Sequence, residues 1–390
     1  MVEIPSRDRW HEPHQSDYPL SGDGDAAGRP GGTDGFLMLK QITIRNFKCF
    51  RLLKIENMKR INVIVGDNGA GKTALLEAMF LAIASTTDLI NRYRTQRGTG
   101  GTLHGTSKRI ADALFAEYFH NFDMRDEIYI TASGDGEESR SVRIYRGARA
   151  VARLKGKTRQ GGDPVDLRSV NFEWEDSKGK KHNIVPTVSS EGISFPDTGE
   201  DLPDFSYFSA MHTQPALDNA ERFSELSRRD RKAEFLETLQ TAYPWIQDLT
   251  IEVAGGISAI YATVEGLKNK LPLGSVSGGV NKVVSALLSI AHRQRSIVLF
   301  DELENGIFYS HHETIWKALI TFASKYEGQI FLTTHSAEWL RALVAAAGDN
   351  TENIALWRIE RDDAGRPILF SFDGPTIKDA IEHGAEARGA

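Results

Sequence analysis

The chain has 390 residues, of which 40% are hydrophobic and 26% are charged, and its formal net charge is −6. This composition is typical of a globular protein with room for two lobes or one large domain, and the negative charge argues against a protein that coats nucleic acid non-specifically. The single cysteine, Cys49, excludes an internal disulfide framework and a four-cysteine zinc site.

The first predicted segment, residues 1–37, is a disordered leader, because it is rich in Gly, Asp, Pro and Ser and has almost no apolar periodicity. The leader lacks the layout of a signal peptide, and no apolar run approaches the roughly 20 residues that cross a bilayer. We therefore expect a cytoplasmic protein with no membrane partner. Residues 38–90 are predicted to form an N-terminal β lobe, with strands over 41–50, 52–56 and 61–65.

Residues 91–203 are predicted to be an inserted region that begins with a loop over 95–107. Three short β-type runs alternate there with Gly, Asp and Lys clusters, which indicates a small antiparallel sheet. The runs cover 128–131, 141–145 and 170–174. Residues 204–270 are predicted to form a helical lobe, because 219–242 is a strongly charged helical stretch.

Residues 271–385 are predicted to form a C-terminal lobe in which helices alternate with continuously apolar strands. This alternation is typical of an α/β fold with a parallel or mixed sheet covered by helices on both faces. The expected elements are a helix over 281–292, a strand over 296–300, a helix over 313–322, a strand over 329–333 and a helix over 337–344.

A glycine-rich turn between the strand over 61–65 and the helix after it fits the phosphate-loop pattern G-x-x-x-x-G-K-[ST]. Backbone N–H groups and the helix N-terminus would both point at an anion there. Lys72 would reach the β- and γ-phosphates of a nucleotide, and the Thr73 hydroxyl would bind Mg²⁺. The alternative is a plain glycine turn. The residues predicted to hold the nucleotide are Asn68, Gly69, Ala70, Gly71, Lys72 and Thr73.

A pair of acids follows the apolar strand over 296–300, at the sheet edge where α/β folds bind ligands. Asp301 would hold the Mg²⁺ through water, and Glu302 would polarise the attacking water. The alternative is a strand end followed by two solvated acids. His335 ends the next apolar strand at the same edge, where its imidazole would contact the γ-phosphate.

A second candidate anion site lies before the helix over 281–292. Ser277, Gly278 and Gly279 are small residues that let a backbone approach phosphate at a helix N-terminus. Because Lys72 already holds the phosphates of its own chain, we expect this site to serve the γ-phosphate of a neighbouring subunit. The alternative is a glycine-rich helix cap.

These motifs, in this order, resemble those of the ABC-type ATPase heads of the structural-maintenance-of-chromosomes (SMC), RecF and OLD group. The segments "LKQITIRNFKCF" and "INVIVGDNGAGKTALLEA" look like the first lobe of such a head, and "LFDELENGI" and "TTHS" look most like the small stand-alone members, often described as AAA-type ATPases. The resemblance covers 38–90 and 204–385. It implies a P-loop ABC-ATPase head, hydrolysis of ATP and a requirement for Mg²⁺.

The resemblance also implies a role for each matching residue. Lys72 and Thr73 would bind ATP with Mg²⁺, Asp301 would support the metal, Glu302 would be the hydrolytic base, Ser277 and Gly279 would act on the partner's nucleotide, His335 would sense the γ-phosphate, and 304–306 would face the dimer partner. Phe308 stands where relatives commonly carry histidine. The usual glutamine after the first helix has no clear equivalent, with Gln96 and the vicinity of Asn121 as candidates.

The function expected from these features is that of an ATP-dependent homo-oligomer, at least a dimer. It would act as a sensor or scaffold that controls a separately encoded nuclease or toxin effector in bacterial antiphage defence. The chain has no heptad run for coiled-coil arms, too few residues after His335 for a Toprim nuclease domain, and no N-K-x-D motif of a GTPase.

Two alternatives stay open. One is a RecF-like ATP-dependent clamp on DNA, for which the basic stretch Arg140–Arg159 would contact phosphates, unless that stretch is an ordinary solvated hairpin face. The other is a nucleotide-binding structural partner that hydrolyses ATP too slowly to matter.

Overall fold

The computed structural model divides the chain into two units, Met1–Asp34 and Gly35–Ala390. All residues that the structure describes lie in the second unit. The predicted leader and the predicted loop over 95–107 are not among the described residues. The described residues are 38–84, 115–135, 139–147, 150–151, 166–167, 170–176, 178–184, 187–189, 192–194, 205–210 and 216–382.

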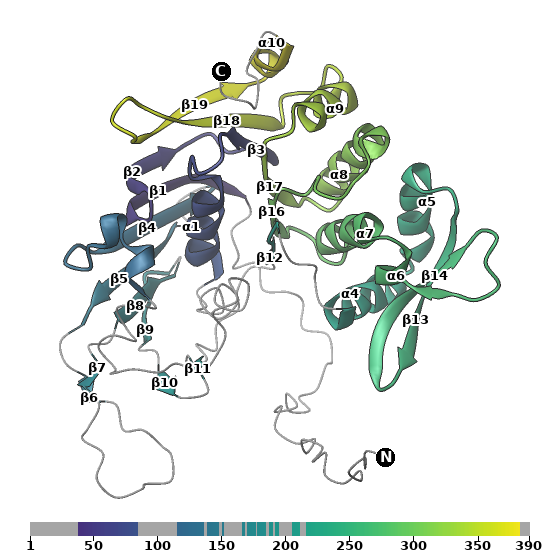
Figure 1. The fold of residues 1–390 in the computed structure, drawn as a ribbon, viewed down its shortest axis with the longest axis horizontal. Coiled ribbons are helices and arrows are strands. Elements are labelled where there is room, and N and C mark those ends of the chain that lie inside the picture. The colour runs from purple at the N-terminus through teal and green to yellow at the C-terminus, as the bar shows by residue number, and fades with distance from the viewer. Residues whose placement is uncertain are drawn as a thin grey trace, which may run out of the picture. The chain divides into compact units, whose positions relative to one another are not determined.

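A six-stranded sheet, mostly parallel, forms the centre of this unit (Figure 1). Its strands, in spatial order, are β12 (Phe205–Phe208), β16 (Ile297–Asp301), β17 (Gln329–Thr334), β3 (Ile61–Gly66), β18 (Ile354–Arg361) and β19 (Pro367–Asp373). Only the β18–β19 pair is antiparallel among these. Every residue of β3, β16 and β17 is buried, as expected for strands covered on both faces. The predicted α/β fold with a mixed sheet is confirmed.

A second six-stranded sheet is antiparallel. Its strands, in spatial order, are β2 (Phe50–Ile55), β1 (Leu39–Phe47), β4 (Ile128–Gly134), β5 (Ser139–Arg146), β8 (Val170–Glu175) and β9 (Lys181–Ile184). The strands predicted for a small sheet of the inserted region therefore continue the N-terminal sheet instead, because β4 pairs with β1 and Ile42 lies opposite Ala132. Buried residues alternate along β4, β5 and β8, which fixes the register of the pairing.

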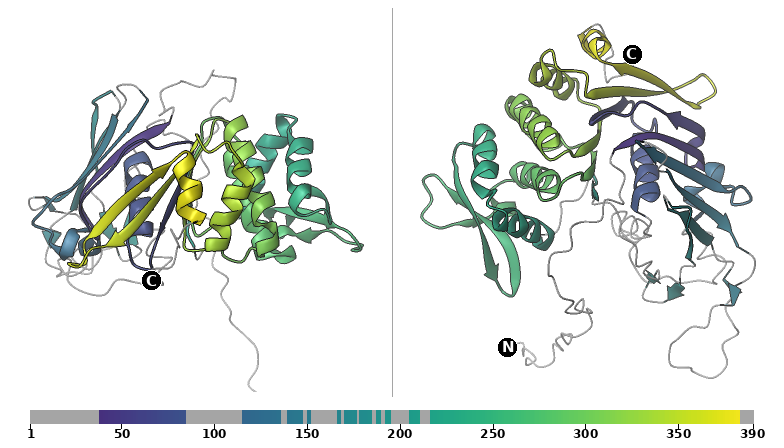
Figure 2. Two further views of the ribbon diagram at one scale, coloured as in Figure 1. Left: turned by 90° about the horizontal axis from the view of Figure 1, so that it is seen from above. Right: turned by 180° about the vertical axis from the view of Figure 1, so that it is seen from behind.

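Helices cover both faces of the central sheet (Figures 1 and 2). The helix α1 (Lys72–Ala84) lies between the central and antiparallel sheets, and its apolar side chains share one core with both. The helices α7 (Gly278–Ala291), α8 (His312–Lys325) and α9 (Ala337–Ala347) pack on the opposite face. Because α1 begins where β3 ends, the phosphate loop lies at the carboxyl edge of the sheet.

The segment predicted as a helical lobe has a more mixed structure. Its helices are α4 (Ala216–Arg228) and α5 (Lys232–Ala242), so the charged helical stretch predicted over 219–242 is confirmed, as two helices. Asp230 separates the two helices with a left-handed backbone (φ 58°). The same segment supplies β12 of the central sheet and a hairpin of β13 (Ile246–Ala254) and β14 (Ile257–Val264).

The remaining elements are short. They are α6 (Leu273–Val276), α10 (Pro375–Glu382), β6 (Ala150–Val151), β7 (Asp166–Leu167), β10 (Thr187–Ser189), β11 (Gly192–Ser194), β15 (Leu271–Pro272) and the 3₁₀ turns η1 (Ala116–Tyr118), η2 (His120–Phe122) and η3 (Tyr309–His311). No helix within the described part of the chain combines the length and apolar character that spanning a membrane requires.

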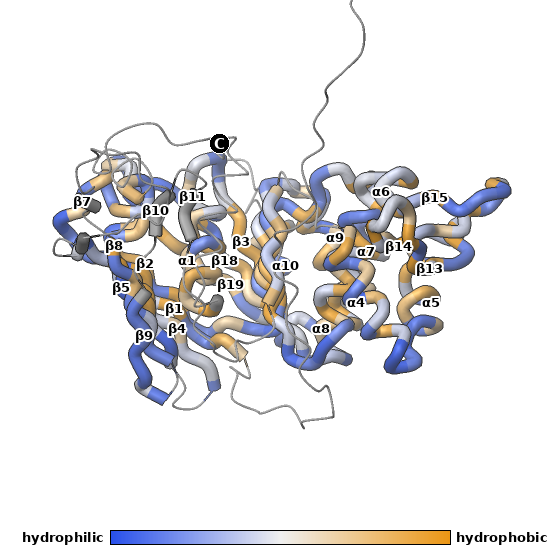
Figure 3. The backbone as a smooth tube through the Cα atoms, turned by 90° about the horizontal axis from the view of Figure 1, so that it is seen from below, coloured by the Kyte–Doolittle hydropathy of each residue, from blue (hydrophilic) through white to orange (hydrophobic). Residues whose placement is uncertain are grey.

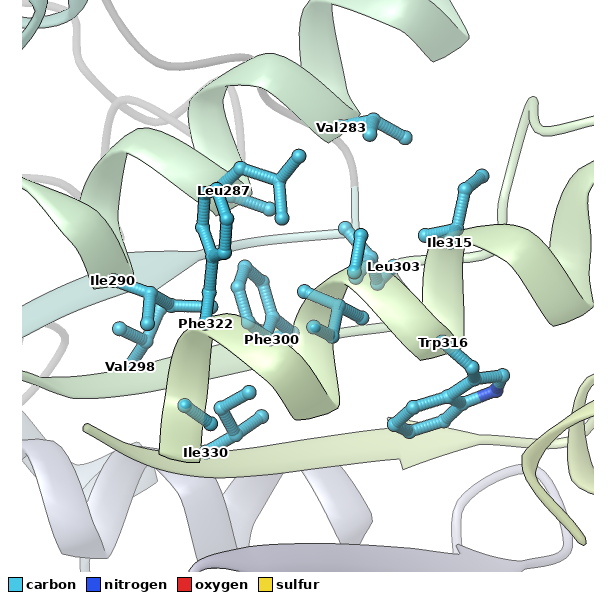
Figure 4. Close-up of a cluster of buried hydrophobic side chains, with 14 of the residues drawn as sticks. Val283, Leu287, Ile290, Val298, Phe300, Leu303, Ile315, Trp316, Phe322 and Ile330 are labelled. Carbon is cyan, nitrogen blue, oxygen red and sulfur yellow. The ribbon is translucent and has the colours of Figure 1, made fainter. Parts of the chain in front are cut away.

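A hydrophobic core joins α7 and α8 to the central sheet (Figure 4). Along the backbone, hydrophobic segments gather in these strands and helices, and hydrophilic segments lie mostly in the outer turns (Figure 3). Burial of each large apolar side chain stabilises such a core by about 1.5–3 kcal/mol. The core therefore holds α7 firmly against the ends of β16 and β17. Its labelled members are Val283, Leu287, Ile290, Val298, Phe300, Leu303, Ile315, Trp316, Phe322 and Ile330.

Candidate functional site

At two positions of the phosphate loop, neighbouring atoms lie too close to leave room for a side chain. A Cβ on Gly66 would lie 2.2 Å from the Ile359 carbonyl oxygen of β18, and the φ of Gly66 is +148°. A Cβ on Gly71, whose φ is +117°, would lie 2.8 Å from Cys49 Sγ. Both positions favour glycine on steric and conformational grounds. The loop is thus fixed between β18 and the turn that joins β1 to β2.

Lys72 is buried at the start of α1, with 6% of its surface exposed. Its Nζ donates to the carbonyl oxygens of Gly66 at 2.7 Å and Asp67 at 3.1 Å. Burial lowers the pKa of Lys72, while the carboxylates of Glu302 and Asp301 oppose this shift. The ammonium is therefore held directly over the loop that would cradle a phosphate.

The other predicted loop residues differ in exposure. Asn68 and Gly69 are exposed, whereas Ala70 is buried. The Ala70 N–H donates to the Asp67 carbonyl oxygen at 3.1 Å, which closes the turn. Of these three residues, Asn68 and Gly69 are thus the ones whose surfaces are open to solvent.

Thr73 and Asp301, which the sequence predicted as metal ligands, lie together. The Thr73 hydroxyl donates to the Asp301 carboxylate, with oxygen–oxygen distances of 3.0 and 3.2 Å, and the Thr333 hydroxyl donates to the same carboxylate at 2.6 Å. Burial raises the pKa of Asp301, and both threonine hydroxyls oppose the shift. A hydroxyl and one carboxylate beside a phosphate loop fit Mg²⁺, which takes few protein ligands and binds substrate phosphates as well.

Glu302 has a strained backbone and a well-held side chain. Its φ of 53° is left-handed, which is uncommon for a residue other than glycine and typical of functional sites. The Glu302 N–H donates to the hydroxyl of Thr333 at 3.1 Å. One carboxylate oxygen lies 3.0 Å from His335 Nδ1, and the other accepts from Asn305 Nδ2 at 2.8 Å. The carboxylate is therefore oriented by two neighbours, one of which is the predicted switch histidine.

Glu304 is a further acid at this edge, and the sequence analysis assigned it only to a loop facing a partner. It is 6% exposed, and burial raises its pKa. The Thr334 hydroxyl donates to Glu304 Oε1, and the same hydroxyl accepts from the Ser336 N–H at 3.0 Å. Glu304 thus ties the loop after β16 to the segment that carries His335.

The Ser277–Gly279 segment does not contact the phosphate loop of its own chain through any hydrogen bond recorded for the described residues. Ser277 caps α7, its Oγ accepting from the Val280 N–H at 3.5 Å, and Ser277 and Gly278 are exposed. Gly279 is instead buried against the loop after Glu302, where a Cβ would lie 2.5 Å from the Gly306 carbonyl oxygen. The segment is therefore open to another molecule at its first two residues only.

We expect Gly279→Ala to lower the free energy of unfolding by about 1–3 kcal/mol, because the new methyl group overlaps a backbone carbonyl that cannot move without shifting the loop. Gly278→Ala is the matched control, since a Cβ there has no atom within 4 Å. Urea unfolding of the two variants measures the difference. Equal stabilities would contradict this account of Gly279.

A basic groove of about 1250 Å³ adjoins the phosphate loop. Arg361, at the end of β18, joins the two by donating to the Gly69 carbonyl oxygen at 2.6 Å. The sequence analysis missed this groove, although the alternating stretches "IALWRIER" and "PILFSFD" around a Gly-containing turn are a hairpin signal. Its basic lining residues are Arg45, Lys48, Arg51, His120, Arg361 and Arg366.

The other predicted residues are placed as follows. Asn121, in η2, lines this groove, whereas Gln96 is outside the described residues. Arg140 is buried, so it does not face solvent as a DNA-contacting residue would. Arg143 is held by Glu127, with nitrogen–oxygen distances of 2.8 Å, and residues 152–159 are outside the described part.

Comparison with known proteins gives a family match over most of the chain. A family model described as "AAA domain, putative AbiEii toxin, Type IV TA system" matches residues 61–341. An ATP/GTP phosphatase of Helicobacter pylori is 21% identical over 362 residues, which cover 84% of this chain and 93% of that protein.

Longer proteins match over parts of the chain. The chromosome partition protein Smc of Methanocaldococcus jannaschii is 31% identical over 218 residues, which are 55% of this chain and 17% of that protein. The DNA double-strand break repair Rad50 ATPase of Methanopyrus kandleri is 32% identical over 111 residues, 28% of this chain and 11% of that protein. Among solved structures, an Smc head bound to the C-winged helix domain of ScpA is similar, with a TM-score of 0.45, 13% identity, and coverage of 88% of this chain and 99% of that one.

Proposed function

Because this chain belongs to the AAA-domain family described as putative AbiEii toxin, and is an ABC-type ATPase of the SMC and RecF group, we propose that it binds ATP with Mg²⁺ and hydrolyses the bond between the β- and γ-phosphates. In the same proposal, two chains close as a homodimer over the nucleotide. The observation that carries this proposal is the convergence of Thr73, Asp301, Glu302 and His335 beside the Lys72 loop. The similarity to a protein named an ATP/GTP phosphatase supports hydrolysis.

Each side chain has a distinct task in the proposed reaction. The ammonium of Lys72 has three donors, two of which now bind carbonyl oxygens. In the proposed reaction, these donors would bind phosphate oxygens. Thr73 and Asp301 would hold Mg²⁺, which neutralises charge on the phosphates when it is bound. The basic groove beside the loop would take the nucleoside end of ATP, as its position next to Gly69 favours.

Glu302 would act as the general base. Its carboxylate would accept a proton from a water molecule as that water attacks the γ-phosphorus and the bridging P–O bond to the β-phosphate breaks. His335, 3.0 Å from the carboxylate, would hold it in place and contact the γ-phosphate. Asn305 would hold the other carboxylate oxygen.

The exposed start of α7 supports the proposed homodimer. Ser277 and Gly278 offer a helix N-terminus at which the partner's γ-phosphate would bind, because their own phosphate loop does not reach them. The exposed side chains of Phe308 and Tyr309, just after the acidic loop, would add apolar contact at the same interface. Of the two, Phe308 stands where the family resemblance implies a histidine.

The biological role that we propose is control of a separately encoded effector, such as a nuclease or toxin, in bacterial antiphage defence. The family description, which names a toxin and a toxin–antitoxin system, supports a role alongside a partner protein. The alternative of a RecF-like clamp on DNA loses one expected contact, since Arg140 is buried.

The composite site is tested by mixing two inactive variants, Lys72→Ala and Ser277→Arg. In a mixed dimer, one of the two sites combines an intact Lys72 with an intact Ser277, so ATP hydrolysis should return in the mixture. The measurement is phosphate release by each variant alone and by the mixture at equal total protein. Failure of activity to return, with both variants folded, would contradict the role of Ser277 across the interface.

A further inference from the structure

Lys282 is a buried lysine that the proposed reaction does not use. It lies on α7 with 9% of its surface exposed, and most of the other buried residues of that helix are apolar. Taking an ammonium out of water is costly unless it finds partners. The position of Lys282 therefore needs an explanation beyond the packing of the helix.

Its partners are two carbonyl oxygens of the acidic loop. Lys282 Nζ donates to the carbonyl of Glu302 and to the carbonyl of Asn305, each at 3.2 Å. Burial lowers the pKa of Lys282, while the carboxylates of Glu304, Glu302 and Asp301 oppose this shift. The surrounding carboxylates thus stabilise the charged form of Lys282, at a position where a neutral side chain would have a smaller desolvation cost.

Glu302 is the residue whose backbone these contacts constrain. Its left-handed conformation is unfavourable for a glutamate, so it persists only because neighbouring groups hold it. Thr333 accepts from the N–H of Glu302, and Lys282 donates to its C=O. The peptide group before the Glu302 side chain is thus held by β17, and the peptide group after it is held by α7.

We propose that Lys282 is a positioning residue for ATP hydrolysis, which holds the Glu302 backbone in its left-handed conformation so that the carboxylate faces the attacking water. The inference rests on the proposed function, because it assigns a task to Glu302. This role differs from a general role in packing, because loss of Lys282 would slow the hydrolytic step at the Glu302 of the same chain. Without the ammonium, Glu302 relaxes toward an ordinary backbone conformation, and its carboxylate turns away from its position between His335 and Asn305.

Kinetics and binding of Lys282→Met separate this role from a structural one. We expect kcat to fall by roughly 10²-fold, because a displacement of about 1 Å in a catalytic group has that effect. The affinity for a fluorescent ATP analogue should change by less than about threefold, since the phosphate loop is untouched, and Lys282→Arg should recover part of kcat because it restores a cationic donor. Lys317→Met is the matched control, because Lys317 is an exposed lysine on α8 that pairs with Glu313.

The mixed-dimer assay then tests whether Lys282 acts within its own chain. The intact site of a Lys72→Ala and Ser277→Arg mixture uses the Glu302 of the Ser277→Arg chain. Lys282→Met placed on the Ser277→Arg chain should therefore abolish the recovered hydrolysis, whereas the same change on the Lys72→Ala chain should leave it. Loss of activity in both placements would indicate a defect of folding or assembly and would overturn the proposal.

Wild-type kcat in Lys282→Met would also overturn it, as would a parallel loss of kcat and ATP affinity that arginine does not recover. If Lys282→Met does not fold, Lys282→Gln, which removes the charge and ends in a shorter, polar amide, carries the same comparisons. Glu302→Gln measured alongside separates the two claims. Full hydrolysis by Glu302→Gln would contradict the proposed function itself, whereas an inactive Glu302→Gln beside a fully active Lys282→Met would contradict only the role of Lys282.

Discussion

Replacing Lys72 with alanine is expected to abolish ATP binding in the micromolar range. The ammonium of Lys72 is held over the phosphate loop by two backbone carbonyls, so it is already placed for phosphate oxygens. Each hydrogen bond to a charged group contributes about 1.5–3 kcal/mol, so losing two or more weakens binding by roughly 10²-fold or greater. Calorimetric titration of ATP with Mg²⁺ measures this loss directly.

The fold of Lys72→Ala should survive, because the buried ammonium is a cost to the protein without nucleotide, as the lowered pKa of Lys72 indicates. We therefore expect a melting temperature equal to that of the wild type or higher. Lys317→Ala serves as the control for removal of a helical lysine, since that side chain is exposed. Tight ATP binding by a folded Lys72→Ala protein would show that the nucleotide binds at another site.

Replacing Glu302 with glutamine is expected to lower kcat by about 10²–10⁴-fold while ATP binding is kept. Removal of a general base has an effect of this size. Glutamine has the same length and can still accept from Asn305, so the loop should keep its conformation. The side chain loses only the ability to take a proton from water. Phosphate release and binding of a fluorescent ATP analogue are measured on the same preparation.

Glu313→Gln is the matched control for this change, because Glu313 is an exposed glutamate on α8 whose salt bridge with Lys317 is of the surface type. It should hydrolyse ATP at the wild-type rate. Hydrolysis by Glu302→Gln within about threefold of the wild type would assign the base to another residue.

The local parts of the site were predictable because their signals are local. The buried run of β3, the glycines that follow and the apolar start of α1 lie next to one another in sequence, as do β16 and Asp301. Apolar runs that end in functional residues indicate the carboxyl edge of a sheet without knowledge of the strand order. The meeting of Thr73 with Asp301 follows from two such predictions combined.

The contacts that were missed depend on tertiary packing. Arg361 reaches Gly69 only because β18 pairs with β3, and nothing in the sequence around either residue specifies that pairing. In the sequence, Lys282 is the one charged residue of α7, and its contact with the Glu302 carbonyl exists only because α7 packs beside the end of β16. Likewise, β4 joins β1 across a long insertion, so the extent of the antiparallel sheet could not be read from local periodicity.

His335 illustrates an intermediate case. The sequence placed it at the correct edge of the sheet, beside the acidic pair, because it directly follows the buried strand β17. Its nearest recorded partner is the Glu302 carboxylate at 3.0 Å, which the sequence could not indicate. Glu302 has a left-handed backbone where it makes this contact, and such a backbone has no signature in residue type.

Light scattering of Glu302→Gln with saturating ATP and Mg²⁺ tests the central claim most directly, namely that two chains close over shared nucleotide. A chain that binds ATP and cannot hydrolyse it should accumulate as a dimer, and the mass should return to that of one chain when ADP replaces ATP. The mass of a single chain with ATP bound, at every protein concentration measured, would contradict the account.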